Sequence, residues 1–213
     1  MDEDLLRYDK SKEIVFIDCE TLNLCLNEVH NLPWQIAMIR CKGDKAIKSW
    51  DIHLKWDTDL KISKEAAQIT RFNRKLHESK AIDKAQAFSI ISEQLDNCDY
   101  IAGHNLLGFD IFLIKSLYRS MGRSYSHLVD KIIDTNYLAR GIKYGIPYNR
   151  KVDSLTAYQY KILHKRQKGV RSNLKALGKE YNIEHDYDNL HDALVDLKLN
   201  LKVWNKIKWS VEV

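Results

Sequence analysis

The sequence predicts an α/β fold in which helices flank a mixed β-sheet. Three observations support this class. First, Glu13–Asp18 (EIVFID) is a continuous apolar, β-rich run, which is typical of a strand buried on both faces. Second, two more strand-like segments follow before the first helical pattern. Third, strand-like and helical segments alternate in the later part of the chain, the order expected when helices cover a sheet.

The first strand is followed by the expected strands Gln35–Cys41 and Ala46–Leu54, which a turn at Lys42-Gly43-Asp44 joins. Ser63 is a typical helix cap, so Ser63–Ile69 is predicted to be a short helix. Apolar spacing and turn signals define the later elements. In chain order these are helix Asp83–Leu95, strand Tyr100–Gly103, helix Ile111–Tyr118, strand Lys131–Asp134 and helices Ser154–Leu163, Ser172–Tyr181 and Leu190–Ile207.

The whole chain has the composition of a soluble globular protein, with 45% hydrophobic and 30% charged residues among its 213. No Ser/Gly-rich linker or internal repeat divides it, so we expect a single domain over residues 1–213, with the motif-bearing core at about residues 13–207. The sequence has no apolar run long enough for a membrane span and no signal-peptide pattern, and its cysteines form no C-x-x-C pair. These features predict a cytoplasmic protein with reduced thiols and no membrane partner.

Three acidic side chains occupy positions where a core would not place them. Asp18 and Glu20 are two residues apart at the end of a buried strand, so they point to the same face and repel each other unless a cation or a proton intervenes. Asp196 lies between Val195 and Leu197 on an apolar helix, where burial without a partner is costly. Taken alone, Asp18 and Glu20 are explained equally well as a polar strand end.

Two further residues are ordinary when taken singly. Asp110 stands at the start of a predicted helix, where an acid suits the helix dipole. His191 precedes Asp196 by five residues, and we place it in the first turn of the last helix. With Asn189 as the cap of that helix, Asp192 also falls in the first turn and is interpreted as structural.

Together these residues belong to three motifs, FIDCET, AGHNLLGFD and HDALVD. In this order they resemble the exonuclease motifs of the DEDDh, or DnaQ-like, 3′–5′ exonucleases. The family pattern needs D-x-E at the end of the first strand, H-N followed by F-D after a later strand, and H-x4-D near a late helix. The resemblance covers about residues 13–207. It implies a ribonuclease H-like fold, with a five-stranded mixed sheet flanked by helices.

The resemblance also implies roles for single residues. The ligands of two Mg²⁺ or Mn²⁺ ions would be Asp18, Glu20, Asp110 and Asp196, and we assign Asp18 to both ions. Neutral His191 would be the general base. Two such ions can activate water on one side of a phosphodiester and stabilise the leaving oxygen on the other. The implied reaction releases nucleoside 5′-monophosphates from the 3′ end of a strand.

The implied partner is nucleic acid, and we favour DNA with single-stranded or frayed ends. An exoribonuclease that trims RNA is the alternative within the same chemical class. A non-catalytic nucleic-acid-binding module is the alternative from a different class, although it would have no physical need for converging acids.

Residues next to the motifs are expected to hold the strand. These substrate-binding candidates are Thr21, Leu22, His104, Asn105 and Phe109. Leu22 and Phe109 are candidates to pack on the terminal base, although Phe109 is explained nearly as well as a core residue. Family members often carry D-x-E-T-T-G, whereas this chain has Leu22 and Asn23 in place of Thr and Gly. That departure concerns the backbone that holds the terminal nucleotide.

Residues 135–179 form a strongly basic stretch in which Asp153 is the only acid. Its candidate nucleic-acid contacts are Arg140, Lys143, Lys165, Arg166, Lys168 and Arg171. Basic groups neutralise phosphates and aromatic rings stack on bases, so the interleaved tyrosines favour a contact surface. The alternative is a solvated basic face with tyrosines in the core. The net charge of +5 agrees with an anionic partner.

Overall fold

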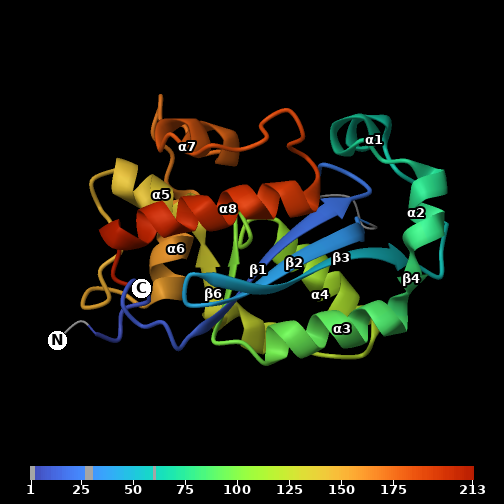
Figure 1. Ribbon diagram of the computed structural model, residues 1–213, viewed down its shortest axis with the longest axis horizontal. Coiled ribbons are helices and arrows are strands. Elements are labelled where there is room, and N and C mark those ends of the chain that lie inside the picture. Colours follow the sequence, from blue (N-terminus) through green and yellow to red (C-terminus); the bar gives the residue numbers. More distant parts are fainter. Residues whose placement is uncertain (1–2, 27–30, 60) are drawn as a thin grey trace.

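A six-stranded mixed sheet forms the centre of the computed structural model, which describes residues 3–26, 31–59 and 61–213 (Figure 1). Its strand order is β4-β3-β2-β1-β5-β6. The strands are β1 (Glu13–Thr21), β2 (Pro33–Lys42), β3 (Lys45–Lys55), β4 (Ile82–Asp83), β5 (Tyr100–Gly103) and β6 (Ile132–Asp134). The pairs β1–β2 and β2–β3 are antiparallel, whereas β3–β4, β1–β5 and β5–β6 are parallel.

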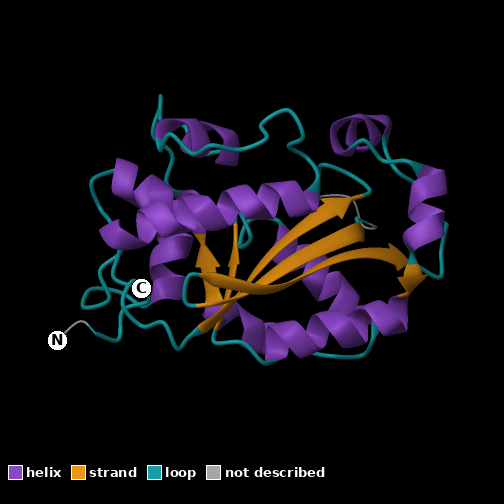
Figure 2. Ribbon diagram, in the orientation of Figure 1, coloured by secondary structure: helices purple, strands orange, loops and turns teal. Residues whose placement is uncertain are grey.

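Eight α-helices are present in the described ranges and flank the sheet. They are α1 (Lys64–Thr70), α2 (Arg74–Lys80), α3 (Lys84–Asp96), α4 (Asp110–Ser120), α5 (Thr135–Lys143), α6 (Leu155–His164), α7 (Leu174–Glu180) and α8 (Ala193–Ile207). Short 3-10 turns cover Ser126–Lys131 and Lys208–Ser210. Figure 2 shows α8 in front of the sheet and α4 behind it. Within the described part of the chain, none of the helices has the length and apolarity needed to cross a membrane.

This arrangement confirms the predicted ribonuclease H-like α/β class, but the expected count of five strands was wrong by one. The additional strand, β4, has only two residues and pairs with the end of β3. An alternating pattern cannot be recognised over two residues, so periodicity could not mark it. All four cysteines have free thiols, in agreement with the expectation from their spacing. The single domain and the cytoplasmic location stay predictions.

Local side-chain chemistry explains where the helices begin. Ser63 Oγ accepts a hydrogen bond from the backbone N–H of Ala66 at 3.1 Å, so α1 starts as predicted. Ser154 caps α6 in the same way. Helix α2 was not predicted, because its sequence RKLHESK has no apolar periodicity and only His77 is buried.

The start of the last helix differs from the prediction. Helix α8 begins at Ala193 rather than Leu190, because the Asp192 side chain accepts the N–H groups of Leu194 and Val195 and is itself the cap. Asn189 is therefore not the cap. His191 lies before the helix with a φ of 74°, which is outside the helical region.

The register of the first three strands places polar side chains in rows across the sheet. Glu20 pairs with Gln35, which pairs with His53 on the next strand. Asp18 pairs with Ala37, which pairs with Asp51. Directly paired residues have side chains on the same face. A polar row therefore extends from the acidic end of β1 over β2 to β3.

Candidate active site

Three carboxylates meet where β1 ends and α8 begins. One oxygen each from Asp18, Glu20 and Asp196 lies within 4.8 Å of the others. The alternation of β1 puts Asp18 and Glu20 on one face, and α8 packs against β1 with Asp196 in its first turn. Residues that are far apart in the sequence therefore form a single anionic group.

Asp110 approaches the same strand from α4. It is the first residue of that helix and is 4% exposed. Its Oδ1 accepts a hydrogen bond from the backbone N–H of Cys19 at 3.1 Å, between Asp18 and Glu20 in the sequence. Asp110 lies outside the group of three that could share one cation, but its charge acts on both Asp18 and Glu20.

The site disfavours ionised carboxylates in the absence of cations. Burial raises the pKa of Asp18 well above its usual range, and the charges of Asp110 and Glu20 raise it further. Burial, followed by the charge of Asp196, also raises the pKa of Glu20. Burial raises the pKa of Asp110 to about 7 and that of Asp196 to about 6. Bound divalent cations would remove this repulsion.

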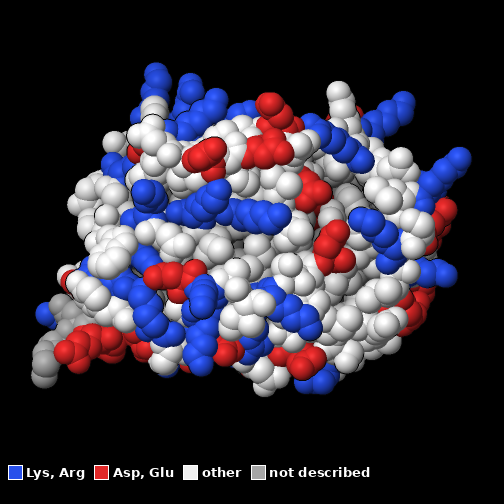
Figure 3. Space-filling view, viewed as in Figure 1, with Lys and Arg blue, Asp and Glu red and all other residues white. Residues whose placement is uncertain are grey.

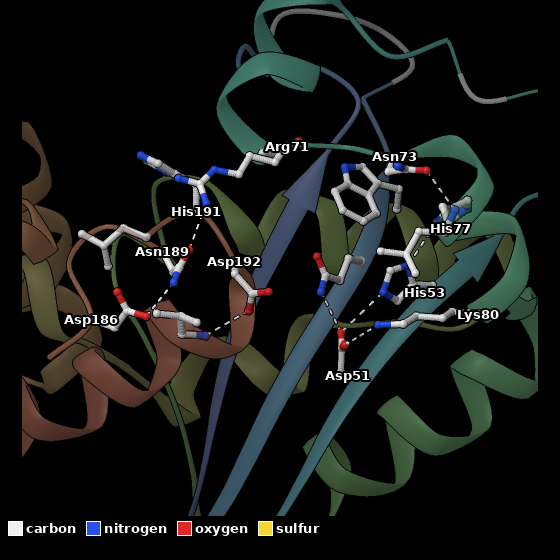
Figure 4. A pocket seen from close by; sticks show the side chains of 16 residues that line it. Asp51, His53, Arg71, Asn73, His77, Lys80, Asp186, Asn189, His191 and Asp192 are labelled. Atoms are coloured by element: carbon white, nitrogen blue, oxygen red, sulfur yellow. Dashed lines mark hydrogen bonds and ion pairs between the residues drawn. The ribbon is translucent and has the colours of Figure 1, made fainter.

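His191 lies in the segment that leads into α8, and its side chain is exposed. Its backbone N–H points to both oxygens of Asp196, at 3.3 and 3.4 Å. His191 and Asp196 line a cavity of about 480 Å³, together with Asn173 and Lys175. A second cavity, of about 390 Å³, extends from His191 over Gln35 to His53 (Figure 4). The proposed base therefore has solvent-accessible space on two sides.

The second motif forms a loop whose polar residues contact the protein itself. His104 Nδ1 lies 3.0 Å from Thr135 Oγ1, and burial lowers the pKa of His104 to about 4. Asn105 has a φ of 70° and accepts a hydrogen bond from the Tyr137 hydroxyl at 2.6 Å. A Cβ on Gly108 would lie 2.4 Å from the Tyr137 oxygen and 2.5 Å from Asn105 Oδ1, so a larger residue here would disturb the Tyr137–Asn105 hydrogen bond. His104 and Asn105 thus hold the loop.

Asp134 organises this loop, and the sequence analysis missed its role. The side chain is fully buried and accepts hydrogen bonds from the backbone N–H groups of Asn105 at 3.0 Å and Leu107 at 2.9 Å. It also caps α5 through the N–H groups of Asn136 and Tyr137. An Asp followed by Thr at the end of a strand is a cap signal that could have revealed α5. Nothing in the local sequence indicates the contact with the loop.

The remaining candidates beside the motifs are mostly covered. Leu22 is 5% exposed and packs with Trp34 in a small apolar cluster, which speaks against direct contact with a terminal base. Thr21 is buried, and its hydroxyl donates to the carbonyl of Asn23. Phe109 is half-buried and packs against the main core, in line with its alternative interpretation.

Two of the basic candidates form hydrogen bonds within the protein. Arg140 donates to the carbonyl oxygen of Lys165, and Lys143 donates to the carbonyl oxygen of Arg171 and to Glu180. They hold the two ends of the loop between α6 and α7, so contact with nucleic acid is not supported for either. The exposed candidates are all on that loop, namely Lys165, Arg166, Lys168 and Arg171. Figure 3 shows basic side chains gathered around α7.

The tyrosines of this stretch largely follow the alternative interpretation. Tyr137, Tyr148 and Tyr158 are buried in the core. Tyr144 is half-buried, and the Arg140 guanidinium carbon lies 5.7 Å from the centre of the Tyr144 ring. Tyr160 is 40% exposed. Base stacking is therefore not available to most of them.

A mixed sheet with carboxylates converging from its central strand and from a helix across it defines the DnaQ-like exonucleases of the ribonuclease H-like superfamily. Residues 15–204 match the family model of RNase T, described as exonuclease, and the chain belongs to this family. A search of curated proteins found no matching sequence.

Solved structures of exonuclease I share the fold. Escherichia coli exonuclease I in complex with a dT13 oligonucleotide has a TM-score of 0.71 and 19% sequence identity, over 92% of this chain and 41% of that one. Exonuclease I from Methylocaldum szegediense has a TM-score of 0.65 and 21% identity, over 93% of this chain and 40% of that one. The chain thus spans about two fifths of the length of these proteins.

Proposed function

We propose that this protein is a metal-dependent 3′–5′ exonuclease that releases nucleoside 5′-monophosphates from single-stranded or frayed DNA ends. The observation that carries the proposal is the convergence of Asp18, Glu20 and Asp196 within 4.8 Å. Their raised pKa values make this group costly unless cations bind there. Family membership supports hydrolysis of a nucleic acid as the reaction.

The donor set fits hard divalent cations. Every side chain of the group offers carboxylate oxygen, the ligand that Mg²⁺ and Mn²⁺ prefer. Asp18, Glu20 and Asp196 would hold one ion, and Asp110 would join Asp18 at a second. When bound, two ions would polarise the phosphodiester and stabilise the charge that develops on its oxygens.

The chain's own residues supply the proton transfer and the binding of the strand. His191 is exposed beside Asp196, so its neutral imidazole can take a proton from the attacking water. The exposed lysine and arginine side chains of the α6–α7 loop offer positive charge to phosphates. Asn173 and Lys175 extend that surface into the cavity beside His191. We favour DNA because E. coli exonuclease I structures hold dT13 and dA16 oligonucleotides.

The test compares 5′-labelled single-stranded DNA and RNA oligomers incubated with the protein and Mg²⁺ or Mn²⁺. We expect a DNA ladder that shortens from the 3′ end and disappears when the ions are chelated. Asp18→Ala and Asp196→Ala should abolish it with the fold intact, and Glu93→Ala, an exposed acid on α3, is the control. Full activity of either variant would overturn the proposal, and faster cleavage of RNA would reassign the substrate.

A further inference from the structure

Arg71 has a backbone conformation that its residue type disfavours. It follows α1 as the C-cap with a φ of 53° and a ψ of 34°, in the left-handed region. Glycine enters this region without steric cost, whereas a residue with a Cβ does not. A strained residue of this kind beside a candidate active site calls for a reason in its side chain.

The Arg71 side chain connects α1 to the segment before α8. Nη1 donates to Oδ1 of Asn189 at 3.0 Å, and Nη2 donates to the carbonyl oxygen of Asp188 at 2.8 Å. Figure 4 shows the side chain extending from the end of α1 toward Asn189 and His191. The planar guanidinium presents a separate nitrogen to each acceptor at a fixed spacing, whereas lysine would have to reach both acceptors from one nitrogen.

Besides Arg71, the segment around His191 is held by Leu190, whose side chain is buried in the core. Asn189 also bonds to Asp186, but that contact lies within the segment. The N–H of His191 lies 3.3–3.4 Å from the Asp196 oxygens, longer than a typical hydrogen bond. Arg71 and His191 both line the two cavities of about 390 and 480 Å³, and so does Leu190.

We propose that Arg71 is a positioning residue that fixes the His191 segment beside Asp196. Its two hydrogen bonds restrict the backbone at residues 188 and 189 and thereby the direction in which the imidazole faces the attacking water. This inference rests on the proposed exonuclease function. A displacement of about 1 Å in a catalytic group can cost two orders of magnitude in rate, which is why such an anchor matters.

Arg71→Gly is the decisive variant because it removes both hydrogen bonds and also relieves the left-handed backbone. The fold should survive, while kcat falls at least tenfold and KM stays within twofold. Arg71→Lys should recover little of the rate because one ammonium nitrogen does not reproduce the fixed spacing of the two guanidinium nitrogens. Asn182→Gly is the matched control, since Asn182 is an exposed left-handed residue (φ 52°) after α7. It should keep the wild-type kcat.

A double variant tests whether Arg71 acts through His191. Adding Arg71→Gly to His191→Ala should cause no further loss of kcat, and millimolar guanidinium should restore part of the rate to Arg71→Gly alone. Additive losses would overturn the inference by indicating direct contact with substrate, and so would a wild-type kcat in Arg71→Gly.

Amide hydrogen exchange tests, without any activity assay, whether Arg71 restrains the segment before α8. Exchange over residues 186–192 should be faster in Arg71→Gly than in wild type, and unchanged exchange there would also overturn the inference. A wild-type protein without metal-dependent cleavage would instead refute the proposed function, and the exchange result would still decide whether Arg71 holds the segment.

Discussion

Replacement of Asp110 by asparagine should stabilise the metal-free protein. The side chain is 4% exposed, and burial raises its pKa from 3.8 to about 7. Asparagine has the same shape and keeps an oxygen to accept the hydrogen bond from the N–H of Cys19. The substitution therefore removes a buried negative charge but retains the hydrogen bond between this side chain and β1.

The size of the effect follows from the difference in pKa. The unfolded chain releases the Asp110 proton near pH 4 and the folded chain near pH 7, so the folded state binds more protons between these values. The stability that the protonated Asp110 contributes is therefore fully present below about pH 4, and it is lost as the pH rises toward 7. At about 1.4 kcal/mol for each pH step, the loss amounts to roughly 4 kcal/mol by pH 8. Asp110→Asn avoids it, and we expect a gain of about 2–4 kcal/mol at pH 8.

Urea unfolding followed by tryptophan fluorescence measures this gain. With divalent ions chelated, Asp110→Asn should be more stable than wild type at pH 8, and the gap should shrink toward pH 5. Saturating Mg²⁺ should stabilise wild type more than the variant, because the ion binds the folded state through the carboxylate. Glu93→Gln, at an exposed position of α3, is the control and should change little. A variant less stable than wild type at pH 8 without ions would refute the reasoning.

Three further predictions concern the proton acceptor, the second motif and the basic loop. His191→Ala should lower kcat by about 10²–10⁴ in single-turnover assays, and a smaller loss would remove His191 as general base. Asp134→Ala leaves four backbone N–H groups without their acceptor. It should lower the free energy of unfolding by about 3–5 kcal/mol in urea titrations, and a loss of less than about 1 kcal/mol would contradict the bridging role of Asp134. Lys168→Gln should reduce the salt dependence of single-strand binding by a slope of about 0.7, while Lys45→Gln on β3 should not; equal slopes would exclude the loop.

The central strand and its acidic side chains could be predicted directly from the sequence. A long apolar run ending in Asp18-x-Glu20 indicates both a buried strand and two side chains on one face, and the structure has both. The placement of Asp196 among apolar neighbours likewise indicates its partial burial. These features are local, because strand alternation and helix periodicity act over a few residues.

The features that could not be predicted depend on distant partners. Asp134 bonds to a loop about thirty residues earlier, and Arg140 and Lys143 bond to carbonyl groups of a later loop. A basic residue has the same sequence signature whether it faces solvent or an internal carbonyl. The position of His191 before α8 depends on which of two neighbouring polar residues caps the helix, and Asp192 does so.

The pairing of β1 with β2 and β5 provides a way to check that the protein has folded correctly. Because side chains alternate along a strand, a slip of β1 by one residue would turn Asp18 and Glu20 away from Asp196 and present Val15, Ile17 and Cys19 in their place. A mispaired molecule could remain compact and yet would have no group of three acids. Cation affinity at this site would thus report correct strand alignment, and it would separate native molecules from compact misfolded ones in a refolding experiment.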